Sequence, residues 1–312
     1  MLPATSAPIS DTAAPLLYAR RPMMRLLIVA SRPHQWVKNA FIFAPLLFGR
    51  KMTDVSAVKA SILAFVVFCL ISSSLYIFND WIDSAEDRSH PDKRKRPISS
   101  GELSAAAALA FAAALAITGF VLALYLNWDF ITVAAAYFFL IIAYSTYLKR
   151  IMILDCIVIA TGFVLRVVGG AAAIDVEPTH WLIACAFVLA LFLAFSKRRQ
   201  ELLTLTNSAA EHRNVLGQYT VPYLEQVNVI LVGVAIVSYA LYTVSPETVS
   251  RFGTDALIYG TGFVVYGLLR YLALINNPKN GGNPSKMLLQ DKPLLATVIA
   301  WAGYNAAIIY VH

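Results

Sequence analysis

Apolar runs of about 20 residues recur along almost the whole chain, and they constrain the fold more than any other feature. Each run is long enough to cross a hydrocarbon layer of ~30 Å as a helix, which satisfies its own backbone hydrogen bonds. Of the 312 residues, 59% are hydrophobic and only 14% are charged, against about 25% charged in an average soluble domain. The sequence therefore predicts an all-α, polytopic transmembrane helical bundle.

Nine segments are candidate membrane spans, separated by turn-forming or charged clusters. They cover approximately residues 27–49, 57–79, 104–126, 129–148, 152–173, 181–196, 228–245, 256–275 and 294–311. The first is the weakest because Arg32, Pro33 and Lys38 interrupt it, so we expect it to begin as an interfacial segment. Residues 1–22 are rich in Ala, Pro, Ser and Thr, and we expect a disordered cytoplasmic tail. Residues 23–312 would then form a single transmembrane catalytic domain.

Basic residues are distributed unequally between the two sets of connecting segments. Nineteen lysines and arginines fall in the N-terminal region and in the loops after the second, fourth, sixth and eighth spans, and four fall in the opposite set. Because basic residues favour the cytoplasmic side, we expect a protein of the inner (plasma) membrane with a cytoplasmic N-terminus. The net charge of +7 is mostly this asymmetry, so nucleic-acid binding has little support.

Three aspartates follow Asn79 where the second span gives way to a basic loop. They are Asp80, Asp83 and Asp87, and at about 100° per helical residue their carboxylates share one helical face. Three like charges repel one another there unless a cation lies among them. Oxygen ligands beside a phosphate substrate suit Mg²⁺. The sequence therefore predicts a Mg²⁺ site at the cytoplasmic mouth of the bundle, with Asn79 as a fourth ligand and the active site facing the cytoplasm.

Further charged and polar side chains are predicted at this membrane face or near it, and they are candidates for contacts with an anionic substrate. They are Lys38, Lys93, Arg94, Arg96, Tyr144, Lys149, Lys197, Arg198 and Glu201. Basic residues at this face can also serve only to hold the loops on the cytoplasmic side of the membrane. We prefer this anchoring role over a substrate contact for Arg150 and Arg199. For Lys95 the two roles are equally well supported.

Arg166 differs from these residues because it lies well inside the fifth span. A charge at that depth is costly and usually faces a cavity or a partner. Asp155 precedes it by eleven residues and falls on nearly the same helical face. Two interpretations stay open for both residues: a structural pair of Arg166 with an acid, or contact with the substrate.

Two neighbouring stretches carry a family resemblance, Asn79-Asp80-x-x-Asp83-x-x-x-Asp87 and Arg96-Pro97-Ile98-Ser99-Ser100-Gly101. They resemble the first signature of the UbiA-type intramembrane prenyltransferase superfamily. Further stretches of the sequence resemble the decaprenyl-phosphate phosphoribosyltransferase branch of this superfamily. They are Arg32-Pro33-His34-Gln35-Trp36-Val37-Lys38-Asn39, His90-Pro91-Asp92-Lys93-Arg94-Lys95-Arg96-Pro97, Tyr144-Ser145-x-x-Leu148-Lys149, Asp155, Arg166 and Lys197-Arg198-Arg199-Gln200-Glu201. The resemblance covers roughly residues 25–300 and implies a UbiA-like bundle of nine helices.

One departure separates this chain from superfamily members that prenylate aromatic acceptors. Those members carry a second aspartate-rich box near the end of the sixth span. Here no aspartate occurs between Asp175 and Asp255, and the corresponding place reads Ser196-Lys197-Arg198-Arg199-Gln200-Glu201. One acidic and one basic cluster suit a Mg²⁺-diphosphate together with a second phosphate, which favours the phosphoribosyl branch.

The resemblance implies transfer of 5-phosphoribosyl from phosphoribosyl pyrophosphate to a long polyprenyl phosphate, such as decaprenyl phosphate. Pyrophosphate would leave, and the product would be a lipid-linked pentose precursor for cell-envelope glycans. Asp80, Asp83 and Lys197 are then the expected catalytic residues, and Glu201 would bond ribose hydroxyls or orient Lys197. A lateral opening toward the membrane lipids would admit the polyprenyl tail.

Two rival functions are open to a chain of this kind. The first is a UbiA-type aromatic prenyltransferase that moves an isoprenyl group to a quinone-precursor ring. The second is a membrane transporter. Against transport, the charged groups gather at one predicted face instead of along a midplane route, and paired Gly/Pro interruptions of helices are lacking.

Overall fold

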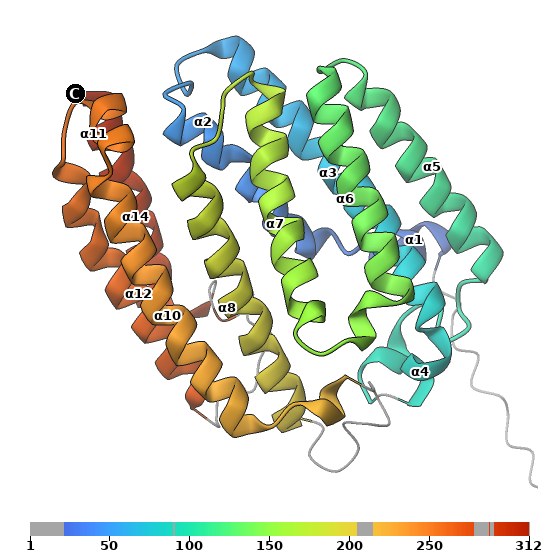
Figure 1. The fold of residues 1–312 in the computed structure, drawn as a ribbon. Helices are drawn as coiled ribbons and strands as arrows, with labels where there is room; N and C mark the ends of the chain where they lie inside the picture. Colours follow the sequence, from blue (N-terminus) through green and yellow to red (C-terminus); the bar gives the residue numbers. More distant parts are fainter. Residues whose placement is uncertain (1–21, 90, 205–214, 278–286, 288–289, 312) are drawn as a thin grey trace, which may run out of the picture.

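The computed structural model describes residues 22–89, 91–204, 215–277, 287 and 290–311. Long antiparallel helices dominate it (Figure 1). They are α3 (Val55–Ile82), α5 (Ala105–Ala123), α6 (Trp128–Thr146), α7 (Leu154–Ala173), α8 (His180–Thr204), α10 (Val221–Val244), α12 (Thr261–Asn276) and α14 (Lys292–Val311). Eight helical segments of the described chain are long and apolar enough to cross a membrane. The predicted multi-pass helical bundle is confirmed, while all but the last residue of the predicted tail at 1–22 lies outside the described residues.

The helices begin where polar residues cap them. The Asp54 carboxylate accepts hydrogen bonds from the backbone N–H groups of Ser56 and Ala57 at the start of α3, as is usual for a residue that caps a helix N-terminus. Asn127 caps α6 and also donates to the carbonyl of Ala172 at 2.6 Å. This hydrogen bond therefore holds the start of α6 against the end of α7.

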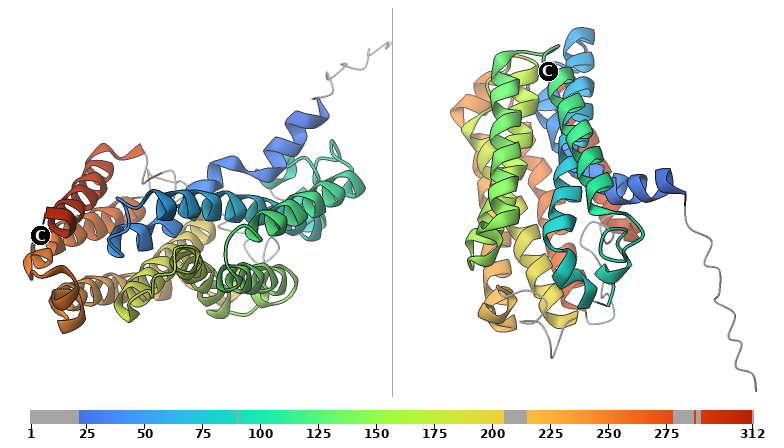
Figure 2. Two further views of the ribbon diagram at one scale, coloured as in Figure 1. Left: turned by 90° about the horizontal axis from the view of Figure 1, so that it is seen from above. Right: turned by 90° about the vertical axis from the view of Figure 1, so that its right-hand side faces the viewer.

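The first predicted span is not one helix, and this part of the sequence prediction needs correction. Residues 27–49 are divided among three short elements: α1 (Met23–Ser31), the 3₁₀ helix η1 (Pro33–Phe43) and α2 (Ala44–Phe48). The break falls at Arg32, whose φ of 52° is left-handed and which precedes a proline that cannot continue the helical hydrogen bonds. In Figure 2, α1 extends sideways from the bundle, in keeping with the predicted interfacial start.

Close packing against α3 and α7 holds η1 inside the bundle. Asn39 Nδ2 donates to Ser72 Oγ at 3.2 Å, and Trp36 Nε1 donates to Ser73 Oγ at 3.0 Å. On the other side, a Cβ added at Gly170 would meet the carbonyl oxygen of Ile42 at 2.1 Å. Only glycine permits this approach. The polar residues of η1 are therefore fixed near the centre of the bundle.

The connections divide between the two ends of the bundle as the charge pattern predicts. One end carries α4 (Ser84–Ser89) and the short 3₁₀ helices η2 (Lys93–Lys95), η3 (Leu148–Arg150) and η4 (Leu216–Gln218). The opposite end carries α2, α11 (Pro246–Phe252), η5 (Ala256–Gly260) and the chain's C-terminal end (Figure 1). We call the first the basic end and the second the far end.

Candidate active site

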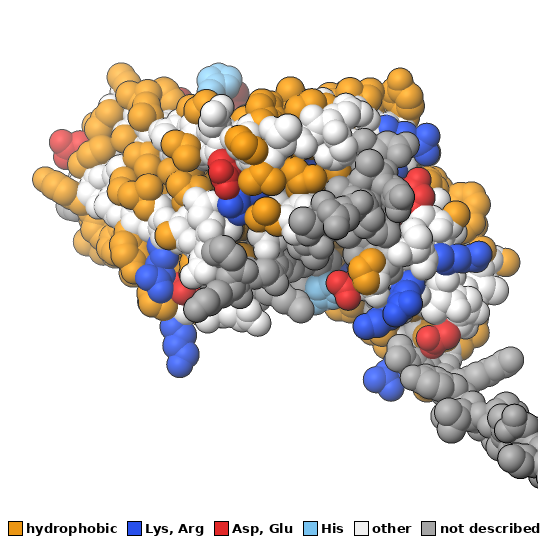
Figure 3. All heavy atoms as spheres, turned by 90° about the horizontal axis from the view of Figure 1, so that it is seen from below, with side chains coloured by type: hydrophobic (Ala, Val, Ile, Leu, Met, Phe, Trp, Pro, Cys, Tyr) orange, Lys and Arg blue, Asp and Glu red, His pale blue; other side chains and the backbone are white. Residues whose placement is uncertain are grey.

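A cavity of about 1950 Å³ runs from the basic end into the interior of the bundle. At the basic end its wall is charged, with contributions from α3, α4, η2, η3 and α8. Toward the far end the wall becomes apolar and is formed by α8, α10, α12 and α14. Seen from the basic end, acidic and basic side chains are interspersed on the surface (Figure 3). One continuous space therefore joins a charged mouth to an apolar arm.

The predicted aspartates meet at the mouth of this cavity. Asp80 lies in the last turn of α3, Asp83 ends that helix, and Asp87 belongs to α4. Asp80 and Asp87 are joined by Arg96, whose Nη1 lies 3.0 Å from Asp80 Oδ1 and 2.5 Å from Asp87 Oδ2. The helix breaks at Asp83, so the three carboxylates do not follow one continuous helix as predicted, yet they remain together.

Every carboxylate of this group has a basic partner. Arg32 forms an ion pair with Asp80, and Lys149 forms one with Asp83. The remaining oxygen of Asp83 accepts a hydrogen bond from Asn79 Nδ2 at 2.9 Å. We call Asp80, Asp83 and Asp87 with Arg32, Arg96 and Lys149 the charged mouth; its positive and negative charges balance.

The donor chemistry of the charged mouth fits a magnesium ion that arrives with a substrate. No group of three or more Asp, Glu, His or Cys side chains within the described residues is arranged to hold a metal alone. Mg²⁺, however, is usually held by one or two carboxylates, while waters and substrate phosphates complete its six oxygen ligands. The four predicted ligands thus remain a prediction for the substrate-bound state.

At the end of α8, Arg198 is buried within the protein, while Lys197 and Glu201 face the cavity. The Arg198 side chain is 1% exposed, and its Nε donates to Asp155 Oδ2 at 2.6 Å. The same guanidinium bonds Glu201 and the Tyr144 hydroxyl. Lys197 Nζ lies 3.8 Å from Glu201 Oε1. Arg198 therefore orders the acidic and hydroxyl groups that line this wall.

Asp155 is buried and does not line the cavity, and its recorded contacts are with the protein. Its second oxygen accepts a hydrogen bond from the Tyr219 hydroxyl at 2.7 Å, and Tyr219 in turn accepts one from the backbone N–H of Ile153. Burial, with the adjacent Asp155 carboxylate, raises the pKa of the Tyr219 phenol. Tyr219 consequently stays protonated and keeps donating to Asp155.

Arg166 lies deep in the cavity and is bonded to neutral groups. Its Nε donates to Asn39 Oδ1 at 2.7 Å, Nη2 to the Tyr137 hydroxyl at 2.7 Å, and Nη1 to the Gly162 carbonyl at 2.8 Å. The pairing of Arg166 with Asp155 that the shared face allowed is wrong. Eleven residues separate them by roughly 16 Å along a helix, and Arg198 from the neighbouring helix reaches Asp155 instead.

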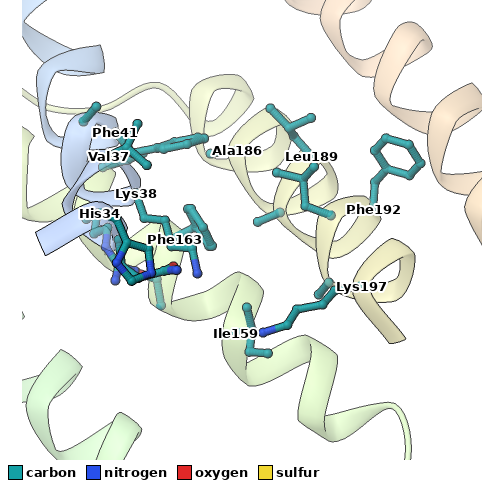
Figure 4. Close-up of a pocket in the computed structure, with 18 of the residues that line it drawn as sticks. His34, Val37, Lys38, Phe41, Ile159, Phe163, Ala186, Leu189, Phe192 and Lys197 are labelled. Carbon is teal, nitrogen blue, oxygen red and sulfur yellow. The ribbon is translucent and has the colours of Figure 1, made fainter. Parts of the chain in front are cut away.

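Lys38 and Lys197 extend into the cavity from opposite walls (Figure 4). Lys38 belongs to η1 and stands near Phe41 and Phe163, whereas Lys197 belongs to α8. Both were predicted to contact substrate, and the structure brings both to the same space. Their separation along the cavity gives it two cationic regions inside the mouth.

Several residues depart from their sequence-based assignments. Arg32 was not among the predicted site residues, although a charge that interrupts an apolar run was the available signal. Lys95 and Arg150 line the cavity, whereas Arg94 does not. Arg199 is no anchor at the membrane surface: it is buried, and it bonds Glu225 and the Ile275 carbonyl.

Exposed apolar side chains from η1 and α14 line the apolar arm. Val37 of η1 and Ile299 of α14 line the cavity and are 45% and 63% exposed. Nearer the far end, the first segment and α14 are joined by hydrogen bonds: the Tyr310 hydroxyl accepts one from the backbone N–H of Met52 at 2.9 Å and lies 3.3 Å from the Leu46 carbonyl. The lateral opening for a lipid tail stays a prediction.

Known proteins of similar sequence and fold agree with this arrangement. The profile of the UbiA prenyltransferase family matches residues 41–291. The chain is 32% identical to a decaprenyl-phosphate phosphoribosyltransferase of Mycolicibacterium smegmatis over 97% of its own length and 98% of that protein. For the protein of the same name in Corynebacterium glutamicum, the identity is 33% over 91% of this chain and 87% of that protein. A solved UbiA homolog from Archaeoglobus fulgidus, bound to DMAPP and Mg²⁺, has the same fold: TM-score 0.71, 18% identity, 92% of this chain and 99% of that chain.

Proposed function

Because this chain belongs to the UbiA prenyltransferase family, we propose that it transfers 5-phosphoribosyl from phosphoribosyl pyrophosphate to a polyprenyl phosphate such as decaprenyl phosphate. The observation that carries the proposal is the end of α8, where Lys197, Arg198 and Glu201 stand in place of a second acidic box. A lipid phosphate and a sugar phosphate together need cations at a second place, which this wall supplies. The names of the two relatives described above support the same acceptor and reaction.

The reaction needs positioning more than proton transfer. An oxygen of the lipid phosphate forms a bond to C1 of the ribose, while the bond from C1 to the pyrophosphate oxygen breaks and pyrophosphate leaves with the electron pair. The attacking phosphate is already anionic at neutral pH, so no general base is required. Holding two reactants in line can lower a barrier by roughly 7–11 kcal/mol, and fixed charges at the leaving group add to this.

The charged mouth would receive the leaving pyrophosphate. Arg32, Arg96 and Lys149 pair with carboxylates in the free protein, and the same donors suit phosphate oxygens. Asp80 and Asp83, with Asn79 and Asp87, would hold Mg²⁺. When bound, this ion would neutralise charge that develops on the leaving group.

The end of α8 would position the sugar. Glu201 and Tyr144 line the cavity there and are bonded to the buried Arg198. Glu201 is an acceptor for ribose hydroxyls, and Lys197 is a donor to the 5-phosphate. Asp155 is a positioning residue because it acts through Arg198.

The cellular setting follows from the charge distribution. The charged mouth would face the cytoplasm, where a soluble sugar phosphate is available, in the inner (plasma) membrane. The product would be a lipid-linked pentose precursor for cell-envelope glycans. The lateral opening would let the tail of the acceptor remain among membrane lipids.

One alternative is supported by a specific observation, the DMAPP and Mg²⁺ bound to the solved relative. By this alternative, the chain would move an isoprenyl group to an aromatic ring. A transporter finds less support because the ion pairs that line the cavity gather at its basic end.

A transfer assay separates these functions. Purified protein with Mg²⁺, labelled phosphoribosyl pyrophosphate and decaprenyl phosphate should place the label in the lipid phase. The Asp80→Asn variant should place at least 100-fold less label there, as for the loss of one charged group that stabilises a transition state. Asp129→Asn, which changes an exposed aspartate far from the cavity, should behave as wild type. Turnover of an isoprenyl diphosphate with an aromatic acceptor, and no label in lipid, would overturn the proposal.

A further inference from the structure

Two cations inside the cavity lack the acidic partners that the charged mouth provides. Arg166 bonds only neutral oxygens, those of Asn39, Tyr137 and Gly162. For Lys38, no ion pair with a carboxylate occurs within the described part of the chain. The two cations lie near each other: Asn39, which follows Lys38 in the chain, bonds Arg166, and Phe163, beside which Lys38 lies in Figure 4, has its ring 5.1 Å from the Arg166 guanidinium. By contrast, Arg32, Arg96 and Lys149 at the mouth all pair with aspartates.

Uncompensated positive charge at this depth is unfavourable. Arg166 lies in the middle of α7, a helix long and apolar enough to span the membrane, and it is 5% exposed. Charged groups in such segments are rare and face partners or water-filled cavities. Two adjacent cations without an acid therefore indicate that an anion belongs between them.

We propose that Lys38 and Arg166 bind the phosphate group of the lipid acceptor. This inference rests on the proposed function and deepens it, because it places the two phosphorylated substrates at different positions. The donor's pyrophosphate occupies the charged mouth, and the acceptor's phosphate occupies what we call the inner cation pair, Lys38 and Arg166.

The guanidinium of Arg166 is held ready for such a ligand. An arginine has five N–H donors, and the three recorded bonds of Arg166 use one on each nitrogen. One N–H on each terminal nitrogen remains for a further acceptor, and a guanidinium is well suited to phosphate oxygens. Asn39 is itself fixed by Ser72, so the orientation of Arg166 exists before any ligand binds.

The position of the inner cation pair favours a phosphate with an apolar tail. Lys38 shares η1 with Val37 and Phe41, and all three line the cavity. Val37 is also 45% exposed. A lipid bound along this wall would place its phosphate at Lys38 while its chain stayed along apolar side chains.

The inner cation pair is also close to the donor site, as a transfer reaction requires. Tyr76 lines the same cavity, and the guanidinium of Arg32 lies over its ring at 5.4 Å. Arg32 pairs with Asp80 of the charged mouth, and Arg166 lines the same cavity as these residues. The acceptor's phosphate and the leaving group would therefore share one cavity.

Direct binding in detergent tests this placement without turnover. We expect wild-type protein to bind a polyprenyl phosphate at least tenfold more tightly than the polyprenol of equal length. Lys38→Met should weaken binding of the polyprenyl phosphate about 10- to 100-fold, the usual effect of one lost bond to a charged group. Its affinity for the polyprenol and for Mg²⁺-phosphoribosyl pyrophosphate should stay within twofold of wild type.

Two further variants separate charge from folding. Lys38→Arg keeps the charge and should retain most of the preference for the phosphate. Lys59→Met removes an exposed lysine that does not line the cavity and should bind both lipids as wild type does. Arg166→Gln should lose the phosphate preference as Lys38→Met does, provided that its thermal unfolding in detergent matches wild type.

The outcomes distinguish the source of the phosphate. Weaker binding of phosphoribosyl pyrophosphate by Lys38→Met, with unchanged lipid binding, would assign the pair to the sugar's 5-phosphate and overturn the proposal. Unchanged binding of both substrates would overturn it as well. If wild-type protein transfers no phosphoribosyl group but Lys38→Met still abolishes the lipid-phosphate preference, the acceptor site stands and the proposed donor is wrong.

Discussion

At the basic end of the bundle, α3 and α8 both end at ion pairs, but the two pairs differ in how far they are exposed. At the end of α3, the side chains of Asp83 and its partner Lys149 are 20% and 10% exposed, and both line the cavity. At the end of α8, the side chains of Arg198 and its partner Asp155, from the first turn of α7, are 1% and 0% exposed. Asp155 also bonds Tyr219 behind the wall.

This difference separates charges that a substrate can engage from charges that hold the fold. An ion pair at a cavity wall can exchange one partner for a phosphate or a metal ion. A fully buried pair cannot, because removal of one partner leaves an uncompensated charge in a medium that solvates it poorly. Both pairs join an acid and a base that are far apart in the chain, and their burial is what tells the two kinds of pair apart.

The largest expected effect follows from breaking the buried pair. Asp155→Ala removes the buried carboxylate that Arg198 Nε contacts and leaves Arg198 paired only with the partly exposed Glu201, so it should lower the free energy of unfolding by about 3–5 kcal/mol. Denaturation in detergent, followed by the loss of helical circular dichroism, measures it. The double variant Asp155→Leu/Arg198→Met should recover much of the loss because neither charge remains.

The matched variant at the other helix end is Asp83→Ala. It leaves Lys149 beside the cavity and should cost no more than about 1 kcal/mol, as for pairs with access to water. Equal losses of stability in Asp155→Ala and Asp83→Ala would show that the two ion pairs do not differ in the way their burial indicates.

Sequence analysis predicted the helical bundle and the aspartates because both depend on local patterns. The apolar runs determine which segments span, and the spacing of Asp80, Asp83 and Asp87 keeps them together even though α3 ends at Ile82. Their basic partner Arg96 was also identified, since it follows closely in the chain. These features depend on residues close together in the chain, for which the helix period tells which side chains share a face.

What the sequence did not predict depends on contacts between distant helices. The Asp155–Arg198 pair joins α7 to α8, and Arg32 reaches Asp80 across 48 positions of the chain. A helical wheel orders residues around one helix but says nothing of the neighbour that faces them. For this reason the wheel placed Asp155 on nearly the same face as Arg166 and left their pairing open, whereas the packing of η1 supplies Asn39 to Arg166.

The second expected effect concerns catalysis at the accessible pair. Asp83→Asn keeps the hydrogen bond from Asn79 possible but removes a negative charge where Mg²⁺ would bind. We expect kcat for lipid labelling to fall about 10²–10³-fold, with thermal unfolding close to wild type. Raising the Mg²⁺ concentration should recover part of the rate, and a wild-type kcat would contradict the assignment of Asp83.

The smallest effect on catalysis is expected for the basic member of that pair. Lys149 holds Asp83 in the free protein and would contact the donor's pyrophosphate when substrate binds. Lys149→Met should therefore raise KM for phosphoribosyl pyrophosphate about tenfold, in line with one lost charged contact, and leave KM for the lipid phosphate unchanged. Lys51→Met is the matched control, since Lys51 lies at the far end with Asp54 at 3.9 Å. If Lys149→Met instead lowered stability as Asp155→Ala does and left KM intact, Lys149 would belong with the fixed pairs of α8, and the donor would be held by Arg32 and Arg96 alone.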